Sequence, residues 1–427
     1  MLKHKHGALE THMDLNHSQR DGQPASLSET SWRYRGWLVA AAAMVGLMFG
    51  PSTIAILSFG IFMHPLEAAF GWSRPEVAIA STIVSYTAMV IAPLQGYLVD
   101  RYGTRPVIVP CVPLFALAVG AMYFLPAVHW LYYLAWIVLP VTGIGVFPLS
   151  YIRVVSSWFD KKLGLAIGIA NAGIGIGNAA LPLILNRLIR DHGWRVGFLG
   201  MAVLALAVTF PAVFFLIQEK PGTDTHTLAK TQADRQDFRL AVSSKRFRLM
   251  AMIFVLLGLV STALVVHQIP LLIDAGLTPQ RAALVQATFG IFVIVGRIAT
   301  GLLIDLLDAP LVMMAWVLGA AATCLLYASD VTGNLVFLCG ALLGMLIGAE
   351  FDVLGYLLKR YFGMHSFGKL HGIVFAVFQF GAGAGAALLP FIRQSTGSYR
   401  EGLLLFAGAM LICVLLLWLL RRIDTNP

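Results

Sequence analysis

The strongest constraint on this chain is a series of twelve apolar runs of about 20 residues, the length that a helix needs to cross a bilayer. Of the 427 residues, 58% are hydrophobic and only 12% are charged, whereas a soluble domain carries roughly 25% charged residues. So few charges cannot cover the surface of a soluble protein. The sequence therefore predicts an all-α polytopic membrane protein with twelve transmembrane helices. The expected spans are residues 36–63, 78–99, 106–126, 130–152, 163–189, 196–217, 249–273, 282–304, 309–328, 334–358, 370–393 and 402–420.

One long polar stretch, residues 218–248, separates the first six spans from the last six. GIGIGNAALP at 173–182 returns 208 residues later as GAGAGAALLP at 381–390, and GYLVD at 96–100 returns 205 residues later as GLLID at 301–305. The repeat indicates a duplicated six-helix bundle. Duplicated halves are a recurrent plan of secondary transporters, which bind substrate between the halves near the midplane. The expected organisation is a tail (1–35), a first bundle (36–217), a linker (218–248), a second bundle (249–420) and a short tail (421–427).

The 30 lysines and arginines exceed the 21 acidic residues, which gives a formal charge of +9. With the N-terminus placed in the cytoplasm, 22 of the basic residues fall on the cytoplasmic tails and loops, 7 on outer loops and one, Arg297, inside a helix. This bias predicts a multi-pass protein of the cytoplasmic (inner) membrane with both termini inside. The positive charge is thus mainly an orientation signal, so nucleic acid is not an expected partner. Anionic membrane lipid is expected at residues 245–248 (KRFR).

No cofactor or metal is expected. The four cysteines lie in apolar runs and read as core residues rather than disulfide or metal ligands. GIGIGN at 173–178 mimics a dinucleotide motif but follows no strand, and residues 363–369 mimic a phosphate loop but are followed by Leu370 in place of Ser or Thr. Both glycine runs are better explained by close helix packing or chance, which argues against ATP-driven transport.

The loop after the second span, residues 96–105 (GYLVDRYGTR), resembles the GxxxDRxGxR signature of the major facilitator superfamily, and residues 301–305 are a degenerate second copy. The resemblance implies two pseudo-symmetric six-helix bundles. Charges at this helix end can lock neighbouring helices, and a glycine lets them approach closely; the alternative is a simple positive-inside anchor. The residues predicted to act in conformational gating are Gly96, Asp100, Arg101, Gly103, Arg105 and Asp305.

Within that superfamily, residues 158–173 (WFDKKLGLAIGIANAG) resemble a signature of the bacterial monocarboxylate and oxalate/formate porters, and Arg297 resembles their substrate-binding arginine of span 8. Two features depart from those families. Val293 stands where mammalian monocarboxylate carriers have an aspartate, and residues 372–392 lack the second cation of the oxalate carrier. A single intramembrane cation favours a monoanion over a dicarboxylate.

Three ionisable residues lie at membrane depth, where each costs about 2.5–3.5 kcal/mol on insertion scales. Arg297 lies eight residues before Asp305, hence about 12 Å from the cytoplasmic boundary. Glu350 and Asp352 lie nine and seven residues before Lys359, hence at about 13 and 10 Å. The similar depths allow an ion pair between Arg297 and one of the carboxylates.

Two interpretations of these three residues compete. In the first, a permanent buried ion pair holds the second bundle together. In the second, which we prefer, Arg297 binds the substrate carboxylate while Glu350 or Asp352 accepts the coupling proton. Glu350 is favoured over Asp352 by its depth alone.

Other polar side chains in the spans are candidates for binding a substrate hydroxyl or carbonyl, or else for an interhelical hydrogen bond worth about 0.6 kcal/mol. They are Asn171, Asn178, Tyr86 and Gln379. His267, with Gln268 beside it, is a further candidate for substrate binding or an outer gate, although a lone histidine is more often a packing residue. Arg153 is expected to be an anchor or gate pair rather than a ligand.

Together these features predict a secondary active transporter, and not an enzyme, that moves a small organic monoanion with protons by alternating access and functions as a monomer. A monocarboxylate, including aromatic and lactone acids, is the expected substrate class. Two alternatives stay open. One is a major facilitator exporter of drug-like or amphipathic compounds, which would not need Arg297. The other is a membrane sensor or scaffold without transport, against which the lack of a soluble signalling domain argues.

Overall fold

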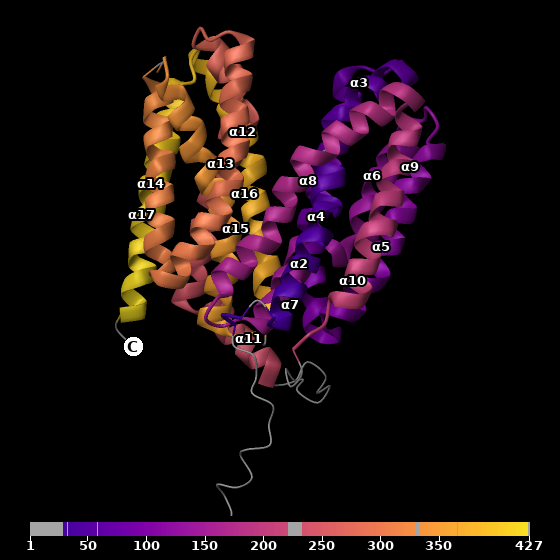
Figure 1. Cartoon of the computed structure of the whole chain (residues 1–427). Helices are drawn as coiled ribbons and strands as arrows, with labels where there is room; N and C mark the ends of the chain where they lie inside the picture. Colours follow the sequence, from indigo (N-terminus) through magenta and orange to yellow (C-terminus); the bar gives the residue numbers. More distant parts are fainter. Residues whose placement is uncertain are drawn as a thin grey trace, which may run out of the picture.

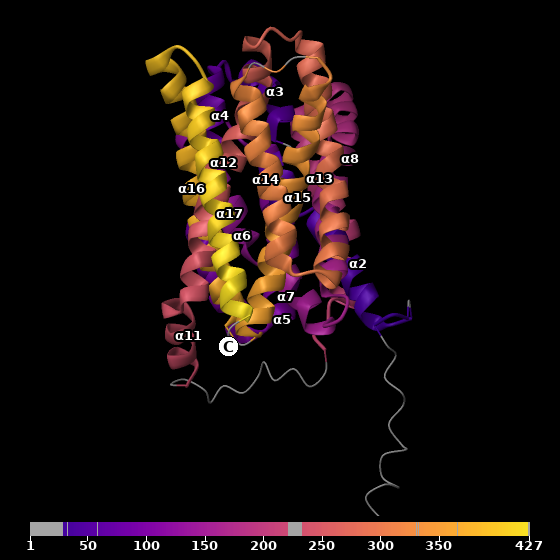
Figure 2. The same cartoon turned by 90° about the vertical axis from the view of Figure 1, so that its left-hand side faces the viewer.

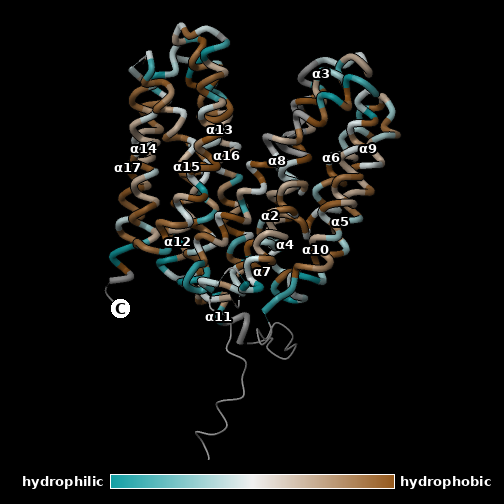
Figure 3. The backbone as a smooth tube through the Cα atoms, viewed as in Figure 1, coloured by the Kyte–Doolittle hydropathy of each residue, from teal (hydrophilic) through white to brown (hydrophobic). Residues whose placement is uncertain are grey.

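The computed structural model describes residues 29–31, 33–57, 59–220, 233–329, 331, 333–364 and 366–425. Within these ranges the chain is helical with no strand, and ten helices are long and apolar enough to cross a membrane. Hydrophobic residues run along most of the helices, while hydrophilic ones gather toward their ends (Figure 3). Large apolar side chains stay exposed, among them Phe124 at 81% and Val90 at 70%. Such wide apolar exposure suits a lipid environment.

The first bundle follows the first six expected spans, with two of them bent by short π-helical segments. It comprises α2 (Arg35–Met48), η1 (Ser52–Leu57), α3 (Phe59–Phe70), α4 (Arg74–Tyr102), α5 (Thr104–Ala121), η2 (Met122–Phe124), α6 (His129–Thr142), η3 (Ile144–Val146), α7 (Pro148–Trp158), α8 (Leu163–His192), α9 (Trp194–Leu204), η4 (Ala205–Thr209) and α10 (Phe210–Leu216).

Two of the twelve expected spans are not among the ten continuous apolar helices. The span expected at 130–152 is divided into α6, η3 and α7, and Pro148 opens α7. Proline suits a first helical turn because its missing N–H has no partner there. The span expected at 163–189 lies in α8, a 30-residue helix of which only Leu163–Gly177 is counted as an apolar segment.

The second bundle is more regular, with one helix for each expected span. It comprises α12 (Lys245–Asp274), α13 (Pro279–Leu306), α14 (Ala309–Ala328), α15 (Leu335–Phe362), α16 (Phe367–Thr396) and α17 (Arg400–Thr425). Ser244 and Thr278 cap the first two helices, because their hydroxyls accept the backbone N–H groups of Phe247 and Arg281.

The two bundles converge at the end that carries the short helix α11 (Ala233–Ser243) and the C-terminus, and they diverge at the opposite end (Figure 1). We call the converging end the linker end; Figure 2 shows α11 and the C-terminus on it from a second side. Two helix pairs form the main contacts between the bundles: α4 packs on α16, and α8 packs on α13, while α7 and α8 also touch α15 and α7 touches α16. We refer to these contacts as the α4–α16 seam and the α8–α13 seam.

Candidate functional site

The ionisable residues predicted at membrane depth lie together inside the second bundle. Arg297 on α13 is 6% exposed, and Glu350 and Asp352 on α15 are 3% and 0% exposed. The Arg297 Nη1 atom lies 3.2 Å from Oδ1 of Asp352, so the ion pair forms with Asp352 rather than with Glu350. A buried charge pair is costly to assemble and more costly to break on one side, because the remaining charge then has no partner.

Asn171 joins this pair from the first bundle. Its Nδ2 atom, on α8, donates to Oδ1 of Asp352 at 2.6 Å, the same oxygen that accepts from Arg297. Asn171 is 1% exposed. A single carboxylate oxygen of the second bundle therefore binds one donor from its own bundle and one from the other.

The cluster has unused hydrogen-bonding capacity. Arg297 Nε, Glu350 Oε2, Asp352 Oδ2 and Asn171 Oδ1 are buried without a hydrogen-bond partner among the described residues. The Glu350 carboxylate lies near the positive charge of Arg297 and near Ser261 of α12. Unpaired buried polar atoms are uncommon in folded proteins and call for an explanation. An arginine with a free donor beside two carboxylates with free acceptors has the chemistry to exchange an anion and a proton.

The α4–α16 seam is closed by a carboxylate at a helix start. Asp100, at the end of α4, accepts the backbone N–H groups of Gly368 and Lys369 at 2.9 and 2.8 Å. These are first-turn amides of α16, where the helix dipole favours a negative charge. A Cβ added at Gly96 would collide with the carbonyl of Gly368, so the two backbones touch directly.

The α8–α13 seam repeats this arrangement with the bundles exchanged. Asp305, at the end of α13, accepts the N–H groups of Gly164 and Leu165 at 2.8 and 3.1 Å, in the first turn of α8. A Cβ at Gly301 would collide with the carbonyl of Gly164. The spacing of 205 residues between Asp100 and Asp305 thus corresponds to equivalent contacts in space.

Asp100 is also part of a buried charge network that Asp305 lacks. Arg153 of α7 lies 3.2 Å from Asp100 and 3.2 Å from Glu219, and its side chain is 5% exposed. Glu219 also accepts the backbone N–H of Thr104. The structure therefore places Arg153 in an ion pair at the seam, as expected for an anchor or gate.

The remaining residues of the predicted loop motif make their hydrogen bonds within the first bundle, as far as the structure describes the chain. Arg101 is exposed and contacts Tyr97, and Arg105 donates to the carbonyl of Phe214 at 3.0 Å. Gly103 has φ = 84°, a left-handed conformation that suits glycine at the tight turn between α4 and α5. These three residues shape the loop but do not reach across the seam.

Within the described residues, the other predicted binding residues form no hydrogen bond with the charge cluster. Tyr86 is 51% exposed, and its hydroxyl lies 3.4 Å from where a Cβ of Gly383 would stand on α16. Gln379 is partly exposed on α16. His267 is bonded through Nε2 to the carbonyl of Ala386 at 2.9 Å, a packing contact inside the second bundle. The predicted Asn178 lies on α8, but its side chain is outside the described part of the chain.

Sequence reasoning missed a further contact between the bundles at the linker end. Lys359 of α15 donates to the backbone carbonyls of Ser156 and Phe159 and to Oδ1 of Asp160, the last at 2.6 Å. The hydrogen bond from Lys359 lowers the pKa of Asp160 below its usual value. Glu29 fixes the same loop by accepting the N–H groups of residues 160–162 at 2.8 to 2.9 Å. A lysine at the end of a span looks like a topology anchor, so the sequence carries no separate signal for it.

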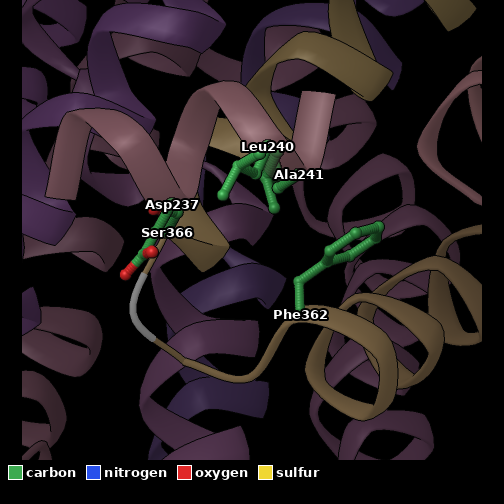
Figure 4. A pocket seen from close by; sticks show the side chains of 6 residues that line it. Asp237, Leu240, Ala241, Phe362 and Ser366 are labelled. Carbon is green, nitrogen blue, oxygen red and sulfur yellow. The ribbon is translucent and has the colours of Figure 1, made fainter. Parts of the chain in front are cut away.

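A small pocket at the linker end has no residue of the charge cluster in its lining (Figure 4). It has a volume of about 300 Å³ and lies between α11 and the junction of α15 and α16. Beside it, the Lys369 ammonium lies 5.7 Å from the ring centroids of both Tyr97 and Phe238, which links α11 to the α4–α16 seam. The lining residues are Asp237, Leu240, Ala241, Phe362, Ser366 and Leu370.

Two helical bundles that meet around buried charges are a recurrent plan of membrane transporters. Residues 41–349 and 268–427 match the family model of the Major Facilitator Superfamily, and the chain belongs to this family. It is accordingly a polytopic membrane transporter and not an enzyme.

The individual relatives within the family share about a quarter of the aligned residues with this chain. The chain is 26% identical over 391 residues to monocarboxylate transporter 13 of Rattus norvegicus, covering 88% of this chain and 86% of that protein. It is 25% identical over 266 residues to the uncharacterized MFS-type transporter YcxA of Bacillus subtilis, covering 60% and 63%. Among solved structures it is similar to the major facilitator transporter FucP in the outward conformation, with a TM-score of 0.73, 16% identity and coverage of 90% and 99%. The last likeness concerns the fold alone.

Proposed function

We propose that the protein carries a small organic monoanion, a monocarboxylate in the first instance, together with a proton. The observation that carries this proposal is Arg297, a buried arginine at membrane depth with a free Nε donor beside two carboxylates. Monocarboxylate transporters among its relatives support the substrate class. The guanidinium matches a carboxylate in charge and in its planar, two-pronged geometry.

The geometry suggests how anion and proton are coupled. An anion that binds Arg297 draws it away from Asp352, which leaves a buried carboxylate without its counter-ion. Such a charge is costly in a low-dielectric interior, so proton uptake by Asp352 or Glu350 accompanies anion binding. When the anion leaves, the ion pair re-forms and the proton is released. Anion and proton therefore move together.

The first test is Arg297→Lys in proteoliposomes under an imposed pH gradient, with labelled monocarboxylates as substrates. We expect uptake to fall more than tenfold, because an ammonium cannot replace the two-pronged bond. The matched control is Arg393→Lys, which changes a half-exposed arginine paired with Asp274 elsewhere in the second bundle. Near-normal uptake by a well-inserted Arg297→Lys protein would contradict the proposal.

The same preparation separates the proposal from an exporter of drug-like compounds. A proton-coupled monoanion carrier loses uptake when the outside is made alkaline and depends on Arg297. An exporter with a broad apolar pocket moves amphipathic compounds and tolerates the loss of Arg297.

We also propose that the linker end faces the cytoplasm and that the two bundles with their linker act as one monomeric carrier. The excess of basic residues on the predicted inner loops supports this orientation. Lys245 and Arg248, both exposed in the first turn of α12, are the candidates for contact with anionic lipid.

A further inference from the structure

The bond between Asn171 and Asp352 differs from the other contacts that join the two bundles. Asp100, Asp305 and Lys359 act at helix ends and bind backbone groups of the opposite bundle. Asn171 instead reaches a side chain that is already part of the buried ion pair. The strength of this contact between the bundles therefore depends directly on the charge of Asp352.

Close to Asn171 the seam also contains a contact that does not depend on charge. One turn earlier on α8, Gly168 faces the backbone carbonyl of Arg297, where an added Cβ would lie 2.8 Å away. That contact is between backbones and does not depend on charge. About one turn further along α8, the side-chain amide of Asn171 adds a polar contact through Nδ2. The Oδ1 atom of Asn171 has no hydrogen-bond partner among the described residues.

The strength of this contact depends on the state of Asp352. A hydrogen bond to an ionised carboxylate is roughly twice as strong as one between neutral groups. With Arg297 in place Asp352 is ionised, and its Oδ1 atom accepts strongly from Asn171. Once Asp352 is neutral, the same oxygen is a weaker acceptor, and the α8–α13 seam loses part of its stabilisation.

We propose that Asn171 is a positioning residue that interlocks the bundles: it keeps the linker end closed while Asp352 is ionised and releases it when Asp352 is neutral. The inference rests on the proposed function, whose proton-coupling step it explains. It assigns to Asn171 the control of when the carrier opens toward the linker side, rather than direct substrate binding. An empty, ionised carrier then rests with the linker end closed, which prevents a futile passage of the proton alone.

The test uses a cysteine reporter at the linker end and requires no substrate. Ser156→Cys is nearly isosteric, and Ser156 is 0% exposed where the bundles meet beside Lys359. All four native cysteines are buried. The rate at which a maleimide labels the Ser156→Cys protein therefore measures opening at the linker end.

We expect Asn171→Leu to raise this labelling rate about tenfold, in line with the loss of a hydrogen bond to a charged group. Asp352→Asn, which imitates the neutral acid, should raise it to a similar extent. The double variant should label no faster than Asn171→Leu alone, since Asp352→Asn acts by weakening the bond that Asn171→Leu removes. A merely structural effect of each substitution would instead multiply the two increases.

The matched control is Ser150→Ala. It removes a buried hydrogen bond of similar length, from Gln95 Nε2 at 2.9 Å, that lies wholly inside the first bundle. Its labelling rate should stay within twofold of the parent. Asn171→Ala provides a second variant if leucine prevents folding.

Two results would overturn the interlock: unchanged labelling in both Asn171 variants, or multiplicative effects in the double variant. Either result leaves the Arg297 uptake test intact. Conversely, normal uptake by Arg297→Lys with the expected labelling pattern would overturn the proposed substrate role and leave the interlock standing.

Discussion

The two seams are alike where they meet the linker end and differ deeper in the molecule. In each, an aspartate at the end of one helix caps the first turn of a helix in the other bundle, next to a glycine pair in direct backbone contact. The α4–α16 seam then gathers charge at the same level, through Arg153 and Glu219. The α8–α13 seam continues into the bilayer depth and reaches the cluster around Arg297 and Asp352.

This difference suggests a division of roles between equivalent contacts. At the α4–α16 seam the buried Arg153 lies 3.2 Å from both Asp100 and Glu219, so its charge is compensated without a substrate. At the α8–α13 seam the cap is simple, and the unpaired Nε of Arg297 and Oδ1 of Asn171 lie further along the same two helices. We infer that duplication produced two similar seams. The α4–α16 seam holds the bundles together, and the stability of the α8–α13 seam depends on the charge of the buried cluster.

The largest expected effect comes from filling either glycine contact. Gly96→Val places a side chain against the carbonyl of Gly368 and so opposes closure of the α4–α16 seam. Gly301→Val does the same against Gly164 in the α8–α13 seam. Overpacking of this kind costs about 3 kcal/mol, which corresponds to about a hundredfold loss of the closed state. The measurement is maleimide labelling of the Ser156→Cys protein. Gly408→Val is the control, because nothing lies within 4 Å of a Cβ there; labelling that stays at the parental rate in the seam variants would refute the close contact.

A smaller, asymmetric effect is expected from neutralising the two caps. Asp100→Asn deprives the buried Arg153 of one of its two carboxylates and should cost about 3 kcal/mol. Asp305→Asn strands no buried cation of this kind and weakens two bonds to backbone amides, which should cost about 1 kcal/mol. Thermal unfolding in one detergent compares them, and equal losses would remove the distinction between the seams.

The smallest effect concerns the Lys359 contact and its response to pH. Because Lys359 holds the pKa of Asp160 below its usual value, the pair contributes above the ordinary aspartate pKa of about 3.9 and is lost only as pH falls through the depressed value. Asp160 is 73% exposed, so the pair is worth about 0.5 kcal/mol after solvent screening. Lys359→Met should therefore raise labelling of the Ser156→Cys protein about twofold, equally at pH 5 and pH 8. An effect confined to one of these pH values would point to a different titrating group.

The positions of the helices and of the two capping aspartates were predictable from the sequence, because they depend on residues close together in the chain. Runs of apolar residues give the helices, and the repeated GYLVD and GLLID segments place Asp100 and Asp305 at equivalent helix ends. The division of the fourth span at Ile144–Val146 was not predicted, although Gly143 and Pro148 flank it. Apolar periodicity measures length and burial, and it is insensitive to one 3₁₀ turn.

The partner of Arg297 was harder to predict. Glu350 and Asp352 are two residues apart on one helix and so point in directions about 160° apart, and only the rotation of α15 against α13 decides between them. The sequence left the partner of Arg297 open between the two carboxylates, and the structure shows the ion pair with Asp352. The bond to Asn171 was out of reach for another reason, since it depends on how the two bundles are closed against each other.

The mutual capping of the bundles also bears on whether the two bundles must follow one another in a fixed order along the chain. Each bundle supplies one carboxylate and receives one at the linker end, so neither has to be synthesised first for the seams to form. The peptide connection between the bundles serves to keep their local concentration high. A chain that begins with the second bundle and continues into the first, or two halves expressed separately, retains every contact that fastens the two seams.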